Sequence, residues 1–285
     1  MNIVRDRLLT LYRQLAEHFA SEPHWWPIIT DTPRFEVLIG TVLVQQTRWQ
    51  TVEAAIARLR EQGLLSPQAL AAADTSELAL LIRPCAFHTQ KAPGLQTICR
   101  HVVERYDGRI DLLLAQERHA LRNELLALPR IGRETADTLM LYAGGHPIFV
   151  VDAYARRLFS RVGLFSGILD PERVPYDALQ RAVETCVEGG PLPAPLWIAR
   201  DGGTFEYPFP SAPHPRALSE HARFYWELHA LIVEACIHHC TASRPRCQQP
   251  GLRPRFVDPR KCAQHCLVCA GCPLRHGCAW HLANS

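Results

Sequence analysis

Cysteines are the residues of this chain that most clearly indicate chemistry, because eight of the eleven lie between Cys236 and Cys278. Clustered cysteines form disulfide frameworks in small secreted proteins. This chain has 285 residues, and its segment 1–17 has the pattern of an amphipathic helix and not of an export signal. In such a protein clustered cysteines more often bind a metal. The sequence therefore predicts a cysteine-ligated metal centre near the carboxyl terminus.

The segment around these cysteines is basic. From Cys240 to the end, seven basic residues stand against one acidic residue, which gives this segment a net charge of +6, whereas the whole chain carries +3. A basic segment on a mildly acidic body favours a polyanionic partner. A solvated basic surface would have the same composition.

A second candidate site is the segment Leu128-Pro-Arg-Ile-Gly-Arg-Glu-Thr-Ala136. The proline ends one helix, Gly132 permits a turn, and a new helix begins at once. The N–H groups at such a helix start bind phosphate, and Arg130 and Arg133 flank the turn. The residues alone are compatible with an anion-binding helix-hairpin-helix or with an ordinary αα-hairpin.

Asp152 follows the hairpin, at the point where the apolar run Phe149-Val-Val ends and another helix begins. Aspartate is a favoured helix N-cap. A capping aspartate can also face a cleft, so the position is compatible with both a structural and a catalytic role.

The hairpin and Asp152 together resemble the helix-hairpin-helix DNA glycosylases of the endonuclease III superfamily. The nearest resemblance is to its endonuclease III-related and 3-methyladenine glycosylase III-like branch. Residues 43–49 and 82–92 resemble two further signatures of that branch. The resemblance covers residues 25–165 well and the cysteine region in part.

The resemblance implies that the chain binds double-stranded DNA, flips a damaged nucleotide out of the duplex and removes its base. Asp152 would be the catalytic carboxylate, which stabilises the cationic sugar or activates water. Gln45 or Gln46 would fill the gap left in the base stack. The hairpin would hold the DNA backbone through the residues Arg130, Ile131, Gly132, Arg133 and Glu134.

Glu134 stands where family members that also cut the DNA strand carry a lysine. A lysine amine forms the Schiff base that permits β-elimination, and a glutamate cannot do so. The only two lysines, Lys91 and Lys261, lie outside the motif. The resemblance therefore implies a monofunctional glycosylase that leaves an abasic site and lacks lyase activity.

The substrate is predicted less directly. Alkylated purines such as 3-methyladenine have a weakened bond to the sugar, and a positively charged base suits an aromatic pocket. The candidate pocket walls, each of which could also be ordinary core, are Trp25, Trp26, Trp49 and Phe87. The alternatives are an endonuclease III-like enzyme for oxidised or mismatched bases and a non-catalytic protein that binds damaged DNA.

The resemblance also bears on the metal. The four residues Cys262, Cys269, Cys272 and Cys278 have the spacing of the iron–sulfur loop in endonuclease III-like enzymes, so a [4Fe–4S] cluster is expected, with zinc as the alternative. Cys240 and Cys247 have the same first interval and directly follow the helix that leads into such a loop. They are therefore alternative first ligands, and the spacing slightly favours Cys262.

Most of the sequence has apolar residues at helical spacing, and no run of period-two alternation occurs. We therefore expect an all-α fold of two lobes. A six-helix barrel with the hairpin would span 31–160, a second lobe 1–30 and 161–239 with an insertion at 187–217, and the cysteine loop 240–285. No apolar run is long enough to span a membrane, and we expect a monomeric, cytoplasmic and nucleoid-associated protein.

Overall fold

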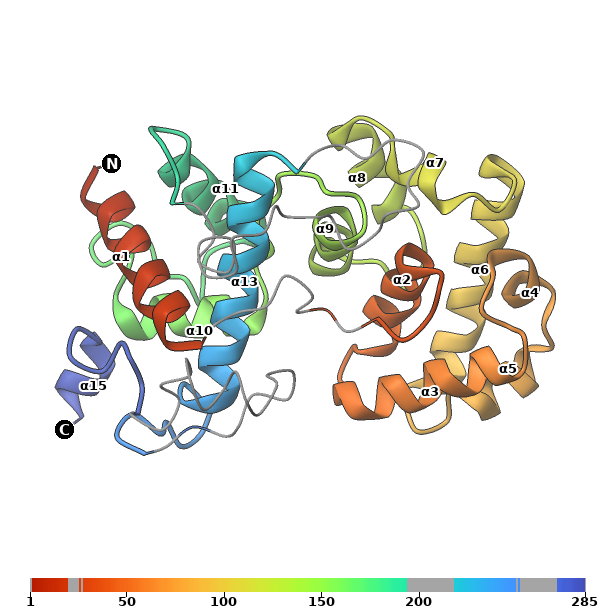
Figure 1. The fold of residues 1–285 in the computed structure, drawn as a ribbon, viewed down its shortest axis with the longest axis horizontal. Helices are drawn as coiled ribbons and strands as arrows, with labels where there is room; N and C mark the ends of the chain where they lie inside the picture. The colour runs from red at the N-terminus through yellow and green to blue at the C-terminus, as the bar shows by residue number, and fades with distance from the viewer. Residues whose placement is uncertain are drawn as a thin grey trace. The chain divides into compact units, whose positions relative to one another are not determined.

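The computed structural model describes residues 2–19, 26, 28–193, 218–249, 251 and 271–284. Every regular element in these residues is a helix (Figure 1), which confirms the all-α prediction for this part of the chain. Three of the expected site residues, Trp25, Cys262 and Cys269, lie outside the described residues, as does most of the expected insertion. None of the described helices is long and apolar enough to cross a membrane.

Packing divides the chain into two units. Among the described residues, unit 1 contains 2–19, 147–193 and those from Leu218 onward, and unit 2 contains 26–146. The sequence-based boundary of the barrel was residue 160, and the packing boundary falls after His146, so Asp152 lies in unit 1.

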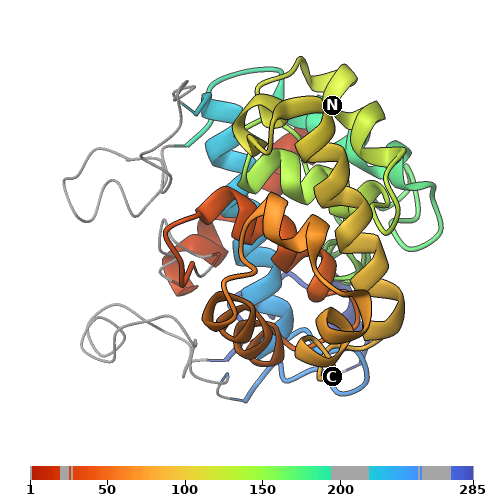
Figure 2. The same ribbon diagram turned by 90° about the vertical axis from the view of Figure 1, so that its right-hand side faces the viewer.

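Unit 2 is built around helix α2 (Pro33–Leu43), whose side chains are buried from Phe35 to Leu43. This helix contacts α3 (Trp49–Glu61), α6 (His88–Tyr106), α7 (Ile110–Leu114) and α9 (Arg133–Tyr142). The short helices α4 (Pro67–Ala72) and α5 (Thr75–Leu81) pack on α6, and α8 (Arg118–Leu126) packs on α9 (Figures 1 and 2).

Local sequence explains where several of these helices begin. The side chains of Ser66, Asp74 and Glu117 each accept hydrogen bonds from backbone N–H groups in the first turn of α4, α5 and α8. Such N-caps satisfy donors that the helix itself cannot pair. Pro33 occupies the start of α2, where its missing N–H costs nothing.

Unit 1 is built around α13 (Glu220–His238), which is buried along most of its length. It contacts α1 (Asn2–Phe19) and α10 (Ala153–Val162). Helix α11 (Tyr176–Val187) packs on α1, and the short α15 (Ala279–Ala283) packs on α10. Helix α10 is therefore the element that contacts both the core helix and the carboxyl-terminal segment (Figure 1).

Candidate functional site

The expected hairpin is present in unit 2 as α8, a short turn and α9. Arg130 adopts a left-handed backbone conformation (φ 65°), and Ile131 buries its side chain beside the turn. The residues Gly132, Arg133 and Glu134 that start α9 are exposed. A Cβ added to Gly132 would meet no atom of the described residues within 4 Å, so these residues leave open space at this helix start.

Buried ionic contacts fix the two hairpin helices. Arg122 on α8 donates to both carboxylate oxygens of Asp137 on α9, at 2.7 and 3.0 Å, and the Asp137 side chain is completely buried. Paired charge-assisted hydrogen bonds of this kind constrain direction as well as distance. They hold α8 and α9 in a single relative orientation.

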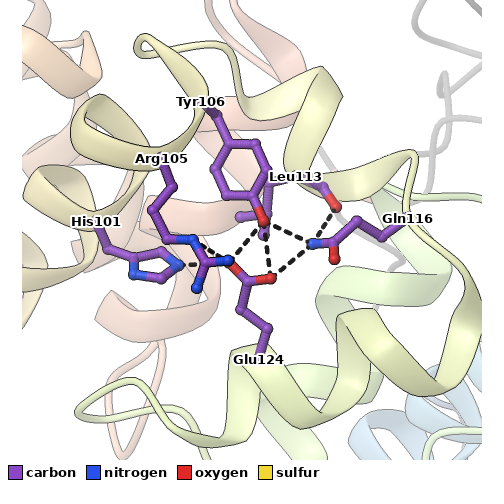
Figure 3. A network of polar contacts seen from close by, with 6 residues as sticks. All are labelled: His101, Arg105, Tyr106, Leu113, Gln116 and Glu124. Atoms are coloured by element: carbon purple, nitrogen blue, oxygen red, sulfur yellow. Dashed lines mark hydrogen bonds and ion pairs between the residues drawn. The ribbon is translucent and has the colours of Figure 1, made fainter.

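A second network ties α8 to α6 (Figure 3). The Glu124 carboxylate accepts hydrogen bonds from the hydroxyl of Tyr106 at 2.7 Å and from the amide of Gln116 at 2.8 Å, and it lies 2.6 Å from Nε2 of His101. Burial opposes the charge of Glu124, but these hydrogen bonds outweigh it and lower its pKa. These contacts therefore hold helix α8 of the hairpin against α6.

The two glutamines after α2 have different surroundings. Gln45 donates from Nε2 to the backbone carbonyl of Arg130 at 2.8 Å and to the hydroxyl of Thr135 at 3.1 Å. Its amide group thus connects this turn to the hairpin. Gln46 is exposed and has a left-handed backbone (φ 54°).

Two of the expected pocket residues lie together. The rings of Trp26 and Trp49 meet edge to face with centroids 5.3 Å apart, and Trp26 also lies 5.4 Å from Tyr142. Both indoles pack over Gly40, where an added Cβ would lie 3.4 Å from each ring. Tyr142 was not among the residues singled out from sequence. Phe87, by contrast, is 47% exposed.

Asp152 lies at the start of α10 in unit 1, where its Oδ1 accepts a hydrogen bond from the backbone N–H of Ala155 at 2.7 Å. The expected N-cap is therefore present. The residue is only 8% exposed. Its other oxygen, Oδ2, lies 3.6 Å from Nε2 of His229, a buried residue of α13. Sequence reasoning missed His229; the one available signal was a histidine within an otherwise apolar helix.

The other end of α10 holds the cysteine region. Arg157 donates from Nε to the carbonyl of Cys240 at 2.7 Å. Arg161 donates to the carbonyls of Thr241 and Ala242 at 2.7 and 2.8 Å and to Cys240 Sγ at 3.3 Å. The Cys278 thiol in turn donates to the carbonyl of Arg161. One helix therefore carries Asp152 at its first turn and binds two cysteines near its last.

Cys240, Cys247, Cys272 and Cys278 are brought into one region. The N–H of Cys272 donates to the carbonyl of Cys247 at 2.9 Å. Burial, with smaller contributions from the other three cysteines, raises the pKa of Cys272 to about 12. The contact with Cys236 and the guanidinium of Arg161 instead hold the pKa of Cys240 below its usual range. Among the described residues, no three histidine, cysteine or acidic side chains are already arranged to hold a metal ion.

Solved DNA glycosylases have a similar fold. A non-covalent endonuclease III–DNA complex matches with a TM-score of 0.66 and 20% identity, over 98% of this chain and 97% of that one. The 3-methyladenine DNA glycosylase MagIII of H. pylori, bound to 1,N6-ethenoadenine, matches with a TM-score of 0.60 and 23% identity, over 80% of this chain and 95% of that one. Likeness at these identities concerns the fold alone.

Sequence relatives agree with that fold. A Methanocaldococcus jannaschii protein named as a DNA repair glycosylase is 31% identical over 82% of this chain and 89% of its own length. Endonuclease III of Thermotoga maritima is 33% identical over 62% of this chain and 74% of its own length. The family model for the HhH-GPD superfamily matches residues 39–182, from within α2 through the hairpin and Asp152 into α11. The match covers the hairpin and Asp152 in their order along the chain. This chain therefore belongs to the HhH-GPD superfamily of base excision DNA repair proteins.

Proposed function

We propose that this protein is a monofunctional DNA glycosylase. It would flip a damaged base out of double-stranded DNA and hydrolyse the bond between base and sugar, leaving an abasic site. The observation that carries the proposal is the setting of Asp152, a buried carboxylate with one oxygen fixed by the N-cap hydrogen bond and the other facing His229.

This setting suits the chemistry of base removal. The N-cap hydrogen bond fixes the rotamer of Asp152, so the carboxylate need not reorganise during the reaction. The positive end of the α10 dipole favours negative charge at this position. Oδ2 is then the oxygen that stabilises the cationic sugar as the base leaves or accepts a proton from the attacking water. His229 is the positioning group for that oxygen.

The hairpin would hold the DNA backbone. The exposed start of α9 offers main-chain N–H groups, and Gly132 leaves space for a phosphate to approach them. Since no neighbouring atom in the described part of the chain requires a glycine there, a ligand is the better reason for it. The phosphate contacts would come from the exposed residues Gly132, Arg133 and Glu134, with Arg130 and Ile131 shaping the turn.

Two facts support the absence of lyase activity. Glu134 is exposed at the position where a Schiff-base lysine would stand. Lys91 is the only lysine among the described residues, and it is completely buried with its amine bonded to backbone carbonyls. No side-chain amine in the described part of the chain is therefore presented to a sugar.

An alkylated purine is our preferred substrate. Trp49, which is partly exposed and packs on the buried Trp26, would supply an aromatic face suited to a cationic base. The similarity to the Thermotoga maritima endonuclease III favours an oxidised or mismatched base as the second candidate.

We also propose that Cys240, Cys247, Cys272 and Cys278 hold a [4Fe–4S] cluster. The donor set suits the cluster, because the other three thiols lie close enough to Cys272 to raise its pKa, and Cys236 together with Arg161 stabilises the thiolate form of Cys240. The bound cluster would supply a structural anchor for the basic carboxyl-terminal segment. The visible absorption of an iron–sulfur cluster in anaerobically purified protein supports this assignment, and a colourless, zinc-containing protein contradicts it.

The test of the main proposal is a single-lesion assay. Duplex oligonucleotides carrying 3-methyladenine, uracil, an oxidised pyrimidine or mispaired adenine are incubated with the protein and resolved with and without alkali. Strand breaks only after alkali, and lost in Asp152→Asn with DNA binding retained, support a monofunctional glycosylase. Breaks without alkali contradict the argument from Glu134. Binding without cleavage of any lesion favours a non-catalytic protein.

A further inference from the structure

Lys91 is the most unusual side chain of unit 2. It lies in the first turns of α6 and is completely buried. Its ammonium group donates to the carbonyl of Leu43 at 2.9 Å, to the carbonyl of Gln45 at 2.7 Å and to the hydroxyl of Thr47 at 3.3 Å. An ammonium has three N–H donors, so each of them has a partner at the end of α2 or in the turn that follows it.

A charge in this position is costly, because burial opposes it and lowers the pKa of Lys91 to about 8. A well-packed apolar side chain would avoid that cost. The ammonium lies at the carboxyl end of α2, where carbonyl groups collect and a cation is favourable. The position therefore makes sense as a means of shaping the turn and not as a source of core stability.

Thr47 extends the contact to a second turn. Its hydroxyl oxygen accepts both the Lys91 bond and a hydrogen bond of 3.0 Å from the N–H of Ala86. The two turns, 44–47 and 84–87, are thus joined through one ammonium and one hydroxyl. Each contains an exposed residue with a left-handed backbone, Gln46 with φ 54° and Phe87 with φ 57°.

The same assembly reaches the hairpin. Gln45, whose carbonyl accepts from Lys91, donates its amide to the carbonyl of Arg130. Arg130 also has a left-handed backbone and donates to Oε1 of Gln90, the neighbour of Lys91 on α6. Non-glycine residues in this conformation persist only where their surroundings over-determine it. Three such residues in one hydrogen-bonded assembly indicate a surface shaped for a ligand.

We propose that Lys91 is a positioning residue that locks the turns 44–47 and 84–87 and the hairpin turn into one preformed surface for DNA opened at a flipped nucleotide. This inference rests on the proposed function. Lys91 is buried and touches no DNA itself. Removal of the Lys91 amine should leave phosphate binding unchanged, because phosphate binding depends on the number of charges contacted. It should weaken binding of the duplex form in which the nucleotide is flipped out.

The experiment uses full-length protein in an Asp152→Asn background, so that chemistry does not contribute. A duplex carrying the preferred lesion next to 2-aminopurine reports base flipping by fluorescence, and an undamaged duplex reports backbone affinity. We expect Lys91→Met to reduce the flipping equilibrium about tenfold, as the loss of a buried hydrogen-bonding group would. Affinity for undamaged DNA should change less than about twofold, because the phosphate contacts are unaltered.

Thr47 supplies a matched pair that keeps the test valid if Lys91→Met fails to fold. Thr47→Val removes the hydroxyl at nearly constant shape and should reduce flipping. Thr47→Ser keeps the hydroxyl and should flip the base as well as the parent does. Thr75→Val is the matched control, because it removes a hydroxyl that donates to Gln96 on α6 at 2.6 Å and lies in none of the three turns. It should lower the melting temperature without changing flipping.

The outcomes separate this inference from the proposed function. Normal flipping by both Lys91→Met and Thr47→Val, in proteins whose Asp152 parent excises a lesion, overturns the inference alone. Equal losses of flipping and of undamaged-DNA affinity also overturn it, because they indicate general disorder of unit 2. A parent that neither excises nor flips any lesion overturns the proposed function together with the inference.

Discussion

Unit 1 and unit 2 both use a cation to gather backbone carbonyls at a functional segment, but they use different cations. In unit 2, the Lys91 ammonium is a buried point charge that contacts the end of α2 and the turn after it. In unit 1, the Arg157 and Arg161 guanidinium groups, which are not fully buried, reach the cysteine segment through several carbonyls. A buried amine can lose its proton, whereas a guanidinium remains charged. The turns of unit 2 should therefore respond to pH through the amine of Lys91, whereas the guanidinium groups of Arg157 and Arg161 keep their own charge.

The largest effect should come from the ion pair between the hairpin helices. Arg122→Met removes the guanidinium that balances the fully buried Asp137, so we expect a loss of about 3–5 kcal/mol in the free energy of unfolding. Denaturant titration measures it. Arg105→Met is the control, because Arg105 is 61% exposed and lies 3.9 Å from Glu124, and it should cost at most about 1 kcal/mol. Equal losses of unfolding free energy in the two variants would mean that the burial of Asp137 does not strengthen its contribution to stability.

The pH dependence of stability tests the difference between the two cations. The Lys91 pKa falls from 10.5 to about 8 in the folded chain, so the unfolded chain binds more protons between pH 8 and 10.5. Stability from this group therefore rises with pH across that window, by about 3 kcal/mol in total. Between pH 7 and pH 11, the free energy of unfolding of the parent protein should rise by this amount relative to that of Lys91→Met.

Arg156→Met provides the control for that measurement. Its stability difference from the parent should stay constant over the same pH range, because a guanidinium does not titrate there and Arg156 donates to the backbone carbonyls of Pro171 and Val174. If the stability difference between the parent and Lys91→Met is also constant with pH, the two units do not differ in how their cations respond to pH.

A smaller effect is expected at the cysteine segment. Arg161→Met removes hydrogen bonds to Thr241, Ala242 and Cys240, and it should lower stability by about 2 kcal/mol. The iron-to-protein ratio after anaerobic purification should also fall. Arg156→Met is the matched control, since Arg156 on the same helix holds the carbonyls of Pro171 and Val174. If both variants lose iron equally, Arg161 has no special role at the cysteines.

The smallest effect should come from His229. His229→Gln leaves the N-cap bond of Asp152 intact but removes the ring that faces Oδ2. Single-turnover excision should slow about tenfold while affinity for undamaged DNA stays the same, as loss of one positioning contact would produce. His221→Gln, at the start of the same helix, should behave like the parent. An unchanged excision rate for His229→Gln would mean that Asp152 acts without His229.

Short-range features of this protein could be predicted from sequence, because their causes lie within a few residues. The helical spacing, the helix start after Gly132 and the N-cap at Asp152 all belong to this class. The left-handed residue of the hairpin turn is Arg130, and Gly132 has an ordinary extended backbone. The family resemblance added the expected roles. Neither source could show that Gln45 is bonded to Arg130 while Gln46 is exposed, because that depends on packing between α2 and the hairpin.

Long-range features were harder to predict. His229 meets Asp152 only because α13 packs on α10. The cysteine spacing slightly favoured Cys262 as first ligand, whereas the structure brings Cys240 and Cys247 to Cys272 and Cys278. Cys262 and Cys269 lie outside the described residues, so the ligand set remains a proposal. Phe87, expected in a pocket wall, is exposed because its left-handed backbone starts α6 at the surface.

The burial of Lys91 has a practical consequence for covalent labelling. Because Lys91 is the only lysine in the described part of the chain and has no exposed surface, an amine-reactive reagent can modify it only while the surrounding turns are open. The rate of acylation at this one residue, followed by mass spectrometry, therefore reports how often those turns open. This rate should fall when DNA covers them.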